Sequence, residues 1–439
     1  MRVAWLLLAA GLAFLPLRWL GWLDFLTGWL ALGWLLVLPA CGIIWLAAER
    51  YLNRAAGIDN DGIFFSGWHT RGWSALAAGS VLTAFYTGLY FGEDLVWPGS
   101  AHSLHDWLQA GLYQYFDPLA RLLTGRVADK WFVYSTLYSY AVLLFGVRML
   151  LKYRHQTYQV WRTLSVIFFQ LSFAWLVPLW LQAMNQPGYY FSYWWPLKPE
   201  YLYPGIWLEW LGKQEGGFWG LYFLIFSAFI SLIGVPVLTW YFGKRWYCSW
   251  VCGCGGLAET MGDPFRQLSQ KSTRAWQIER WTIHTILLLI IAITILLWIN
   301  SIYKGELLGA WSQAAARWYG FLIVSAFGGV IGVGFYPWLG SRIWCRYGCP
   351  MAAILGLIQR FYSRFRITTN GGQCISCGNC STYCEMGIDV RWYAQRGQNI
   401  VRASCVGCGV CAAVCPRGVL RLENGPLLDR QGTEKNMVL

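Results

Sequence analysis

The chain has 439 residues, of which 57% are hydrophobic and only 13% are charged. Because soluble domains are about one quarter charged, this composition excludes an ordinary water-soluble protein and predicts a membrane protein. Aromatic residues make up 18% of the chain, including 30 Trp, and supply ample material for girdles at both lipid–water interfaces.

Eight apolar runs are long enough to cross about 30 Å of hydrocarbon. They lie near residues 3–22, 25–48, 73–92, 131–151, 163–184, 218–242, 283–303 and 318–338. Pro16 and Arg18 interrupt the first run, which has features of a signal peptide, but no small-residue cleavage site follows it, so we expect a span. The predicted fold is an all-α polytopic membrane protein of about eight transmembrane helices, with a C-terminal α+β domain.

Basic residues gather on one side of these spans. If the N-terminus is cytoplasmic, the inner segments carry 25 Lys and Arg residues and the outer segments carry 8. Basic loops remain on the cytoplasmic side. We therefore predict a multi-pass protein of the bacterial cytoplasmic (inner) membrane, with its N-terminus and C-terminal domain in the cytoplasm. The net charge of +13 is then mainly an orientation signal, and no nucleic-acid partner is expected.

The predicted outer loops near residues 93–130 and 185–217 are rich in Trp, Tyr and Pro, as in the segment F-S-Y-W-W-P from Phe191 to Pro196. Aromatic-rich surfaces are common at protein interfaces. Two interpretations remain open: a docking surface for a partner subunit or periplasmic redox protein, and a simple aromatic belt.

Five cysteines follow the sixth and eighth spans. The segments Gly243–Cys254 and Gly340–Pro350 both read G-x-R-x-[YW]-C-x3-C, and the match repeats at an offset of 97 residues. We interpret them as two structural repeats that bring four thiols to one face: Cys248, Cys252, Cys345 and Cys349. A further iron–sulfur cluster or another metal fits these thiols; a redox-active thiol pair and unliganded buried thiols are the alternatives. Cys254 has no counterpart and is either a spare thiol or a substitute ligand.

The last eight cysteines form two ferredoxin-type runs, Cys374 to Cys384 and Cys405 to Pro416. A C-x2-C-x2-C loop supplies three thiolates to a cubane cluster, and in two-cluster ferredoxins the last Cys of each run binds the other cluster. The predicted ligands of the first cluster are Cys374, Cys377, Cys380 and Cys415. Those of the second are Cys405, Cys408, Cys411 and Cys384. A disulfide framework gives no reason for this repeat, and zinc runs usually lack the third and fourth Cys.

These features predict four parts. They are an N-terminal bundle of about five helices at 1–217, a membrane core of about three helices with both C-x3-C repeats at 218–366, a cytoplasmic bacterial-type 2[4Fe-4S] ferredoxin domain at 367–425, and a tail at 426–439. No pair of histidines lies deep in facing spans, so no intrinsic haem is expected. No catalytic residue is predicted.

Two C-x3-C motifs at the cytoplasmic ends of spans, followed by paired ferredoxin runs, resemble the NosR/NapH family of membrane-bound 4Fe-4S electron carriers. The resemblance covers roughly residues 218–425. Cys345 to Pro350 matches the family's C-x3-C-P pattern, whereas Gly253 follows Cys252 where Pro is expected, and Glu385 follows Cys384 where a ferredoxin usually has Pro. The chain is most similar to the membrane core of NosR without its flavin domain, so no flavin is expected.

The expected function is electron transfer between the quinone pool or a membrane redox subunit and the cytoplasmic 4Fe-4S clusters, in a respiratory redox complex. The resemblance implies the quinone and the complex. The alternatives are a metal-centre assembly factor, which reduces or delivers a metal to another enzyme, and a structural subunit whose clusters are its only redox element. With the expected electron-transfer function, the protein would be a subunit of an oxidoreductase complex and would lack a catalytic site of its own.

Overall fold

The computed structural model describes residues 2–23, 25–52, 72–93, 103–212, 219–361, 363–370 and 372–424. The chain divides into two compact units. Unit 1 comprises Met1–Ala56 and Ala84–Ser192, and unit 2 comprises Gly57–Thr83 and Tyr193–Leu439. The predicted membrane core and ferredoxin domain therefore lie in the same unit. The predicted tail at 426–439 lies outside the described residues.

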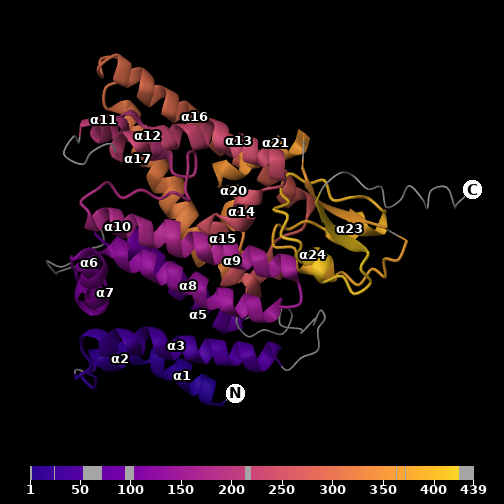
Figure 1. Ribbon diagram of the computed structural model, residues 1–439, viewed down its shortest axis with the longest axis horizontal. Helices are drawn as coiled ribbons and strands as arrows, with labels where there is room; N and C mark the ends of the chain where they lie inside the picture. The colour runs from indigo at the N-terminus through magenta and orange to yellow at the C-terminus, as the bar shows by residue number, and fades with distance from the viewer. Residues whose placement is uncertain are drawn as a thin grey trace, which may run out of the picture. The chain divides into compact units, whose positions relative to one another are not determined.

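Within the described residues, seven helices are long and apolar enough to cross a membrane (Figure 1). They are α3 (Gly28–Tyr51), α5 (Gly72–Phe91), α8 (Lys130–Lys152), the helix Thr157–Ala183, the helix Trp219–Phe242, α16 (Thr273–Ile302) and the helix Trp311–Gly334. They correspond to the second to eighth predicted spans. The predicted fold class, a helical membrane protein with a small C-terminal ferredoxin domain, is confirmed.

The first predicted span is shorter than expected. It forms α1 (Arg2–Leu12) and α2 (Phe14–Trp19). Pro16 has no N–H to continue the helical ladder, and the Arg18 guanidinium donates to the Leu23 carbonyl oxygen at 2.7 Å, which fixes the turn after α2. The helix α1 packs closely on α3, because a side chain at Gly42 would meet Leu8. Within the described residues, this run therefore forms two shorter helices and is not one of the seven long ones.

Unit 1 packs its helices around one apolar cluster, which includes Phe14, Phe116, Phe132 and Leu179. Besides α1 to α3 and α8, it contains α6 (Leu104–Gly111), η2 (Tyr113–Phe116), α7 (Asp117–Thr124), α9 (Thr157–Leu171), η3 (Ser172–Leu176) and α10 (Val177–Ala183). Ser103 and Asp106 form a capping box at the start of α6. The helix α5 belongs to unit 2 up to Thr83 and to unit 1 from Ala84.

In unit 2, the aromatic segment that begins at Tyr193 is folded inward. Trp194 is only 6% exposed, and its ring centroid lies 4.8 Å from that of Tyr247. The Trp195 indole N–H donates to the Thr294 hydroxyl at 3.2 Å, on α16. The segment continues into η4 (Pro199–Leu202) and α11 (Pro204–Gly212). Trp194, Tyr201 and Trp210 of this segment are buried, whereas Tyr193, Trp195 and Trp207 are half-buried. A docking surface and an interfacial belt therefore both stay predictions for the rings that are not buried.

Two similar halves form the membrane part of unit 2. The first half consists of α12 (Trp219–Phe229), the π-helical η6 (Ile230–Gly234), α13 (Val235–Phe242), α14 (Trp246–Trp250), α15 (Gly253–Thr260) and η7 (Asp263–Leu268). The second consists of α17 (Trp311–Tyr319), the π-helical η8 (Gly320–Ile331), α18 (Gly332–Gly334), α19 (Tyr336–Leu339), α20 (Ile343–Tyr347) and α21 (Pro350–Phe361). A glycine with positive φ follows α13 in the first half and α19 in the second, Gly243 at 69° and Gly340 at 88°.

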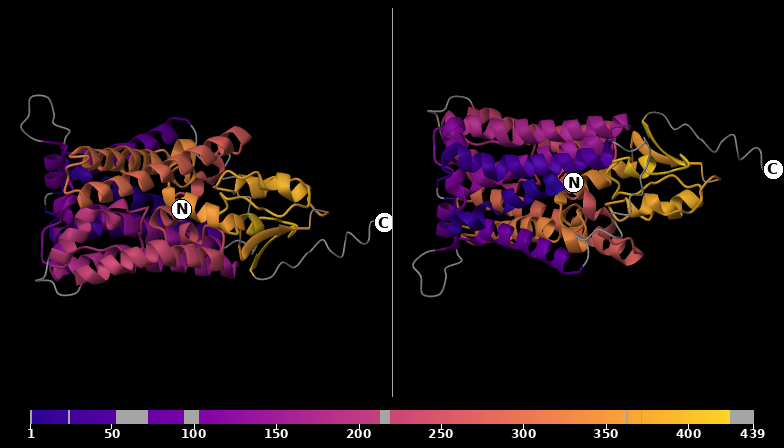
Figure 2. Two further views of the ribbon diagram at one scale, coloured as in Figure 1. Left: turned by 90° about the horizontal axis from the view of Figure 1, so that it is seen from above. Right: turned by 90° about the horizontal axis from the view of Figure 1, so that it is seen from below.

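The ferredoxin domain is built on a two-stranded antiparallel sheet. Strands β1 (Phe365–Thr369) and β2 (Leu420–Asn424) pair with Ile367 opposite Leu422. Between them lie the short helices α22 (Asn379–Thr382), α23 (Val390–Gln395) and α24 (Val410–Ala413). Figure 2 shows this yellow domain beyond one end of the orange and pink helices of unit 2.

Candidate iron–sulfur sites

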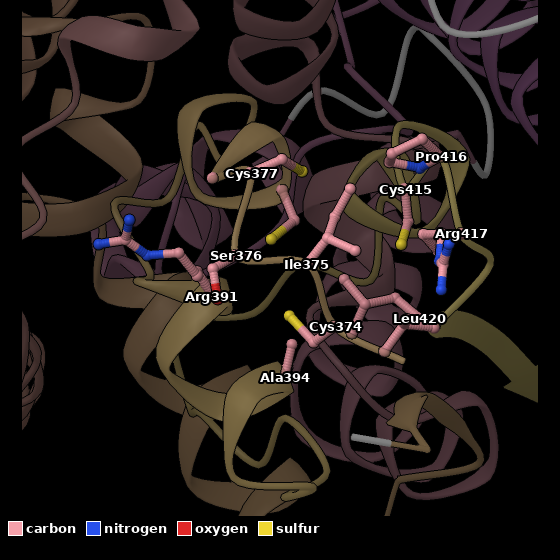
Figure 3. Close-up of a pocket in the computed structure, with 13 residues that line it drawn as sticks. Cys374, Ile375, Ser376, Cys377, Arg391, Ala394, Cys415, Pro416, Arg417 and Leu420 are labelled. Carbon is pink, nitrogen blue, oxygen red and sulfur yellow. The ribbon is translucent and has the colours of Figure 1, made fainter. Parts of the chain in front are cut away.

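The first cavity of the ferredoxin domain is lined by four cysteines. They are Cys374, Cys377, Cys380 and Cys415, and apolar side chains such as Ile375 and Leu420 complete the wall. Figure 3 shows Cys374, Cys377 and Cys415 around one space, with Arg391 and Arg417 at its edge. Three of these thiols come from one run and the fourth from the other. The structure thus brings together the residues of the first predicted ligand set.

A second cavity contains the other predicted set. Its cysteines are Cys384, Cys405, Cys408 and Cys411, and its apolar wall includes Ile367, Met386 and Ile400. The two runs position their thiols in the same way, since α22 and α24 each start after a glycine in the left-handed conformation, Gly378 and Gly409. Only glycine adopts that conformation without steric cost, and it lets the chain wrap closely around the cavity.

The thiols in these cavities are better suited to bind a cluster as thiolates than to ionise as free thiols. Burial raises the pKa of the Cys380 thiol to about 12, and it also raises the pKa of Cys384 and of Cys411. A metal that binds thiolates supplies the charge that such buried groups need. Among the described residues, no three His, Cys, Asp or Glu side chains converge as ligands of a single metal ion would.

The two C-x3-C motifs form a separate group of thiols. Cys248 lies within α14 and Cys345 within α20, Cys252 and Cys349 follow the ends of these helices, and all four are at most 4% exposed. Burial raises the pKa of the Cys248 thiol, and the charges of Cys345, Cys252 and Cys349 raise it further, so the four lie within electrostatic range of one another. A hydrogen bond from Cys254 lowers the pKa of Cys252 to about 7. Cys254 thus acts here as a partner of one predicted ligand.

Two buried arginines tie the halves together around these thiols. Arg245 and Arg342 occupy the same position of the repeated motif, and neither is exposed. The Arg245 guanidinium donates to the carbonyl oxygen of Cys345 at 3.1 Å, and the Arg342 guanidinium donates to that of Cys248 at 3.3 Å. Each arginine therefore holds the first cysteine of the opposite repeat. Arg342 Nη1 also lies 3.7 Å from the Cys345 sulfur.

Carboxylates balance the charge of these arginines. Arg342 Nη2 lies 2.7 Å from a carboxylate oxygen of Glu259 and 2.8 Å from one of Glu385. Glu279 lies between two arginines, with 3.9 Å to Arg245 and 3.2 Å to Arg346. We call this network, together with Arg266 and Asp263, the ionic cluster. Its residues are at most 4% exposed by side chain.

The sequence contained a clear signal for the arginines and only a weak one for the acids. The motif placed an Arg three residues before each first cysteine, and no role for it was predicted. Glu259, Glu279 and Asp263 lie outside any repeated pattern. In a chain with only 13% charged residues, acids close to cysteine motifs are the one hint that was available.

Comparison with known proteins finds iron–sulfur domains in unit 2. Residues 224–272 and 319–368 match the family model described as a 4Fe-4S binding domain, and residues 373–420 match that of a 4Fe-4S dicluster domain. The first model therefore recognises the same two halves as the C-x3-C repeat.

Two curated relatives align with part of the chain. The putative electron transport protein YccM of Escherichia coli is 27% identical over 184 residues, 37% of this chain and 47% of the relative. The methylamine utilization ferredoxin-type protein MauN of Methylobacillus flagellatus is 26% identical over 165 residues, 36% of this chain and 54% of the relative. The chain thus spans about half the length of the curated relatives it matches. No solved structure matches it. The domains, the cysteine-lined cavities and the apolar helices establish a ferredoxin-type membrane protein that binds two [4Fe-4S] clusters in its C-terminal region.

Proposed function

We propose that this protein relays single electrons between its two ferredoxin clusters and a third metal centre held by Cys248, Cys252, Cys345 and Cys349. From that centre electrons pass to or from a quinone or a membrane redox subunit, as in a respiratory complex of the bacterial inner membrane. The ligand sets are those predicted from the two ferredoxin runs. The arrangement resembles the membrane core of the NosR/NapH family.

One observation carries this proposal. Four buried thiols from two similar halves lie within electrostatic range of one another, directly beside the ferredoxin domain of the same unit. Backbone contact joins the two, because the Arg245 N–H donates to the carbonyl oxygen of Cys405 at 3.4 Å. The match of both halves to a 4Fe-4S binding domain supports the same reading.

The residues around the third site have definable roles. When bound, an iron–sulfur centre supplies a one-electron couple whose potential depends on net charge, hydrogen bonds to sulfur and solvent exposure. Arg342 approaches the sulfur of Cys345, and a nearby cation stabilises the extra negative charge of a reduced centre. The buried position of all four thiols excludes water and strengthens this effect.

The experiment combines iron analysis with quinol-dependent reduction of the full-length protein, followed by EPR. We expect more than about eight irons per chain, the number that two cubanes require, and reduction of the clusters by a quinol. The double variant C345S/C349S should lose the third signal and retain both ferredoxin signals. C41S is the matched control because Cys41 lies on α3 in unit 1, outside all the proposed ligand sets.

Three outcomes would contradict the proposal. An iron content of only about eight per chain and an EPR spectrum that C345S/C349S leaves unchanged would contradict the third centre, and clusters that quinols do not reduce would contradict a quinol as their electron donor. Clusters inert to quinols in a protein that retains copper would instead support the assembly factor, the alternative function.

A further inference from the structure

We propose that Glu385 is a positioning residue that joins the ferredoxin domain to the C-x3-C site. It makes the cluster bound by Cys384, Cys405, Cys408 and Cys411 the one that exchanges electrons with the membrane core. The inference rests on the proposed function, because it assumes a redox centre at the C-x3-C thiols. It adds the order of the centres and the residue through which two of them meet.

Glu385 connects the two sites by short contacts. It follows Cys384 directly in the chain and is 1% exposed. Its carboxylate accepts from Arg342 Nη2 at 2.8 Å, while Nη1 of the same guanidinium lies 3.7 Å from the sulfur of Cys345. Cys384 of the second cavity is thus connected to Cys345 of the C-x3-C site through Glu385, its neighbour in the chain, and the guanidinium group of Arg342.

The same carboxylate is held from its other side. Glu385 Oε2 lies 2.9 Å from Arg266 Nη1, and Arg266 Nε donates to Asp263 at 2.8 Å. Removing one partner of a buried ion pair leaves an uncompensated charge, which is strongly destabilising. The two arginines therefore fix the carboxylate in one position, and Glu385 in turn holds Arg342 against Cys345.

Further contacts occur at the same cavity. Gly387, with φ of 64°, packs so closely that a Cβ would lie 2.4 Å from the Gln270 carbonyl oxygen. The Lys244 ammonium donates to the Ile400 carbonyl oxygen at 3.1 Å, and Ile400 lines the second cavity. These contacts attach the loops on both sides of the second cavity to the base of the membrane helices.

The first cavity lies at a more accessible part of the domain. Cys377 is exposed, and Ile375 is 56% exposed. Its closing cysteine, Cys415, is followed by Pro416, the residue usual at this place in ferredoxins, whereas Cys384 is followed by Glu385. The two runs thus differ at the position that contacts the membrane core. The difference assigns the second cluster to internal exchange and the first to exchange with a soluble redox partner.

The proposed step is a simple electron exchange. One electron leaves the reduced centre on one side of the Glu385–Arg342 contact and reduces the oxidised centre on the other. No covalent bond forms or breaks, and no proton is transferred. The two partners of the exchange are the cluster at Cys384 and the centre at the C-x3-C thiols.

The test uses the full-length protein and the variants E385Q and E385D. Dithionite, a soluble one-electron donor, starts the reaction, and rapid freeze-quench EPR follows the ferredoxin signals and the C-x3-C signal separately. Reactions that depend on geometry lose up to about a hundredfold for a 1 Å misplacement, so in E385Q we expect the C-x3-C phase to slow by at least about tenfold. The ferredoxin phase should be unchanged, and E385D, which keeps the charge, should lie between E385Q and wild type.

E423Q is the matched control. It makes the same chemical change in the same domain, on β2, where Glu423 lies opposite Arg366, and it should leave both phases unchanged. Iron content is measured for every variant. Wild-type rates in E385Q and E385D at full iron content would overturn the inference and leave the proposed function intact. A wild-type protein without a C-x3-C signal would overturn the proposed function, and with it the inference.

Discussion

At the scale of single residues, the two motif arginines explain why the repeat contains more than cysteines. Arg245 and Arg342 each donate to a cysteine carbonyl of the opposite half, so they link two segments that lie 97 residues apart in sequence. Sequence reasoning identified the cysteines, because thiol spacing has a direct chemical meaning. It could not assign the arginines, because their partners are a backbone oxygen and acids that share no spacing with them.

We expect R342Q to destabilise unit 2 strongly. The substitution leaves Glu259 and Glu385 buried without their shared cation, and breaking a buried pair costs about 3–5 kcal/mol of unfolding free energy. R342K should cost less, because it keeps the charge but cannot form the fork of the guanidinium. Denaturant unfolding in detergent measures the difference. R360Q, a change of an exposed arginine, is the control, and equal unfolding of R342Q and R360Q would disprove the role of the ionic cluster.

At the scale of elements, the apolar runs predicted the seven long helices well because a span requires a length that is easily recognised in sequence. The break in the first run was missed because Pro16 lacks an N–H and Arg18 forms a local hydrogen bond, and hydropathy registers neither. The aromatic segment after Tyr193 packs inward at Trp194, which was missed for a different reason. Its composition suits a surface and an interior equally, and the contacts that bury it, such as Trp195 with Thr294, join residues far apart in sequence.

The turns after the two repeat helices depend on glycine, and G243A tests this. Gly243 has φ of 69°, and a Cβ there would lie 2.3 Å from the Cα of Ser363. With ψ of −174°, Gly243 has a conformation that essentially only glycine adopts and that costs another residue about 1–3 kcal/mol, and overpacking adds about 1–3 kcal/mol. We therefore expect G243A to lower both the unfolding free energy and the iron retained by the C-x3-C site.

G418A provides the matched control for that turn. Gly418 has a similar φ of 62°, but nothing lies within 4 Å of its added Cβ. It should lose only the conformational part of the free energy, about 1–2 kcal/mol. If both variants lose the same stability, the close approach to Ser363 contributes nothing.

At the scale of the whole molecule, the positive charge has two separate roles. The sequence count treated all basic residues as an orientation signal. The structure shows that Arg245, Arg266, Arg342 and Arg346 are buried in ion pairs with acids. These four help to fix the iron–sulfur end of unit 2. The remaining basic residues at that end, such as Arg360, are the ones on which the predicted orientation rests, because basic loops remain on the cytoplasmic side.

The orientation itself yields the last prediction. The helix α16 begins after Lys271, in the part of unit 2 that contacts the ferredoxin domain, and ends before Lys304. Reporters at its two ends must therefore lie on opposite sides of the membrane. Residues 339–439 carry 12 Lys and Arg, and moving charge across the membrane potential costs about 2.3 kcal/mol per charge and 100 mV.

We expect green fluorescent protein fused after Asn424 to fluoresce and alkaline phosphatase fused after Gly305 to be active. An additional fusion after Gln270 should behave like that after Asn424. Fluorescence after Gly305, with active phosphatase after Asn424, would place the ferredoxin clusters outside the cell and rule out exchange with a cytoplasmic partner.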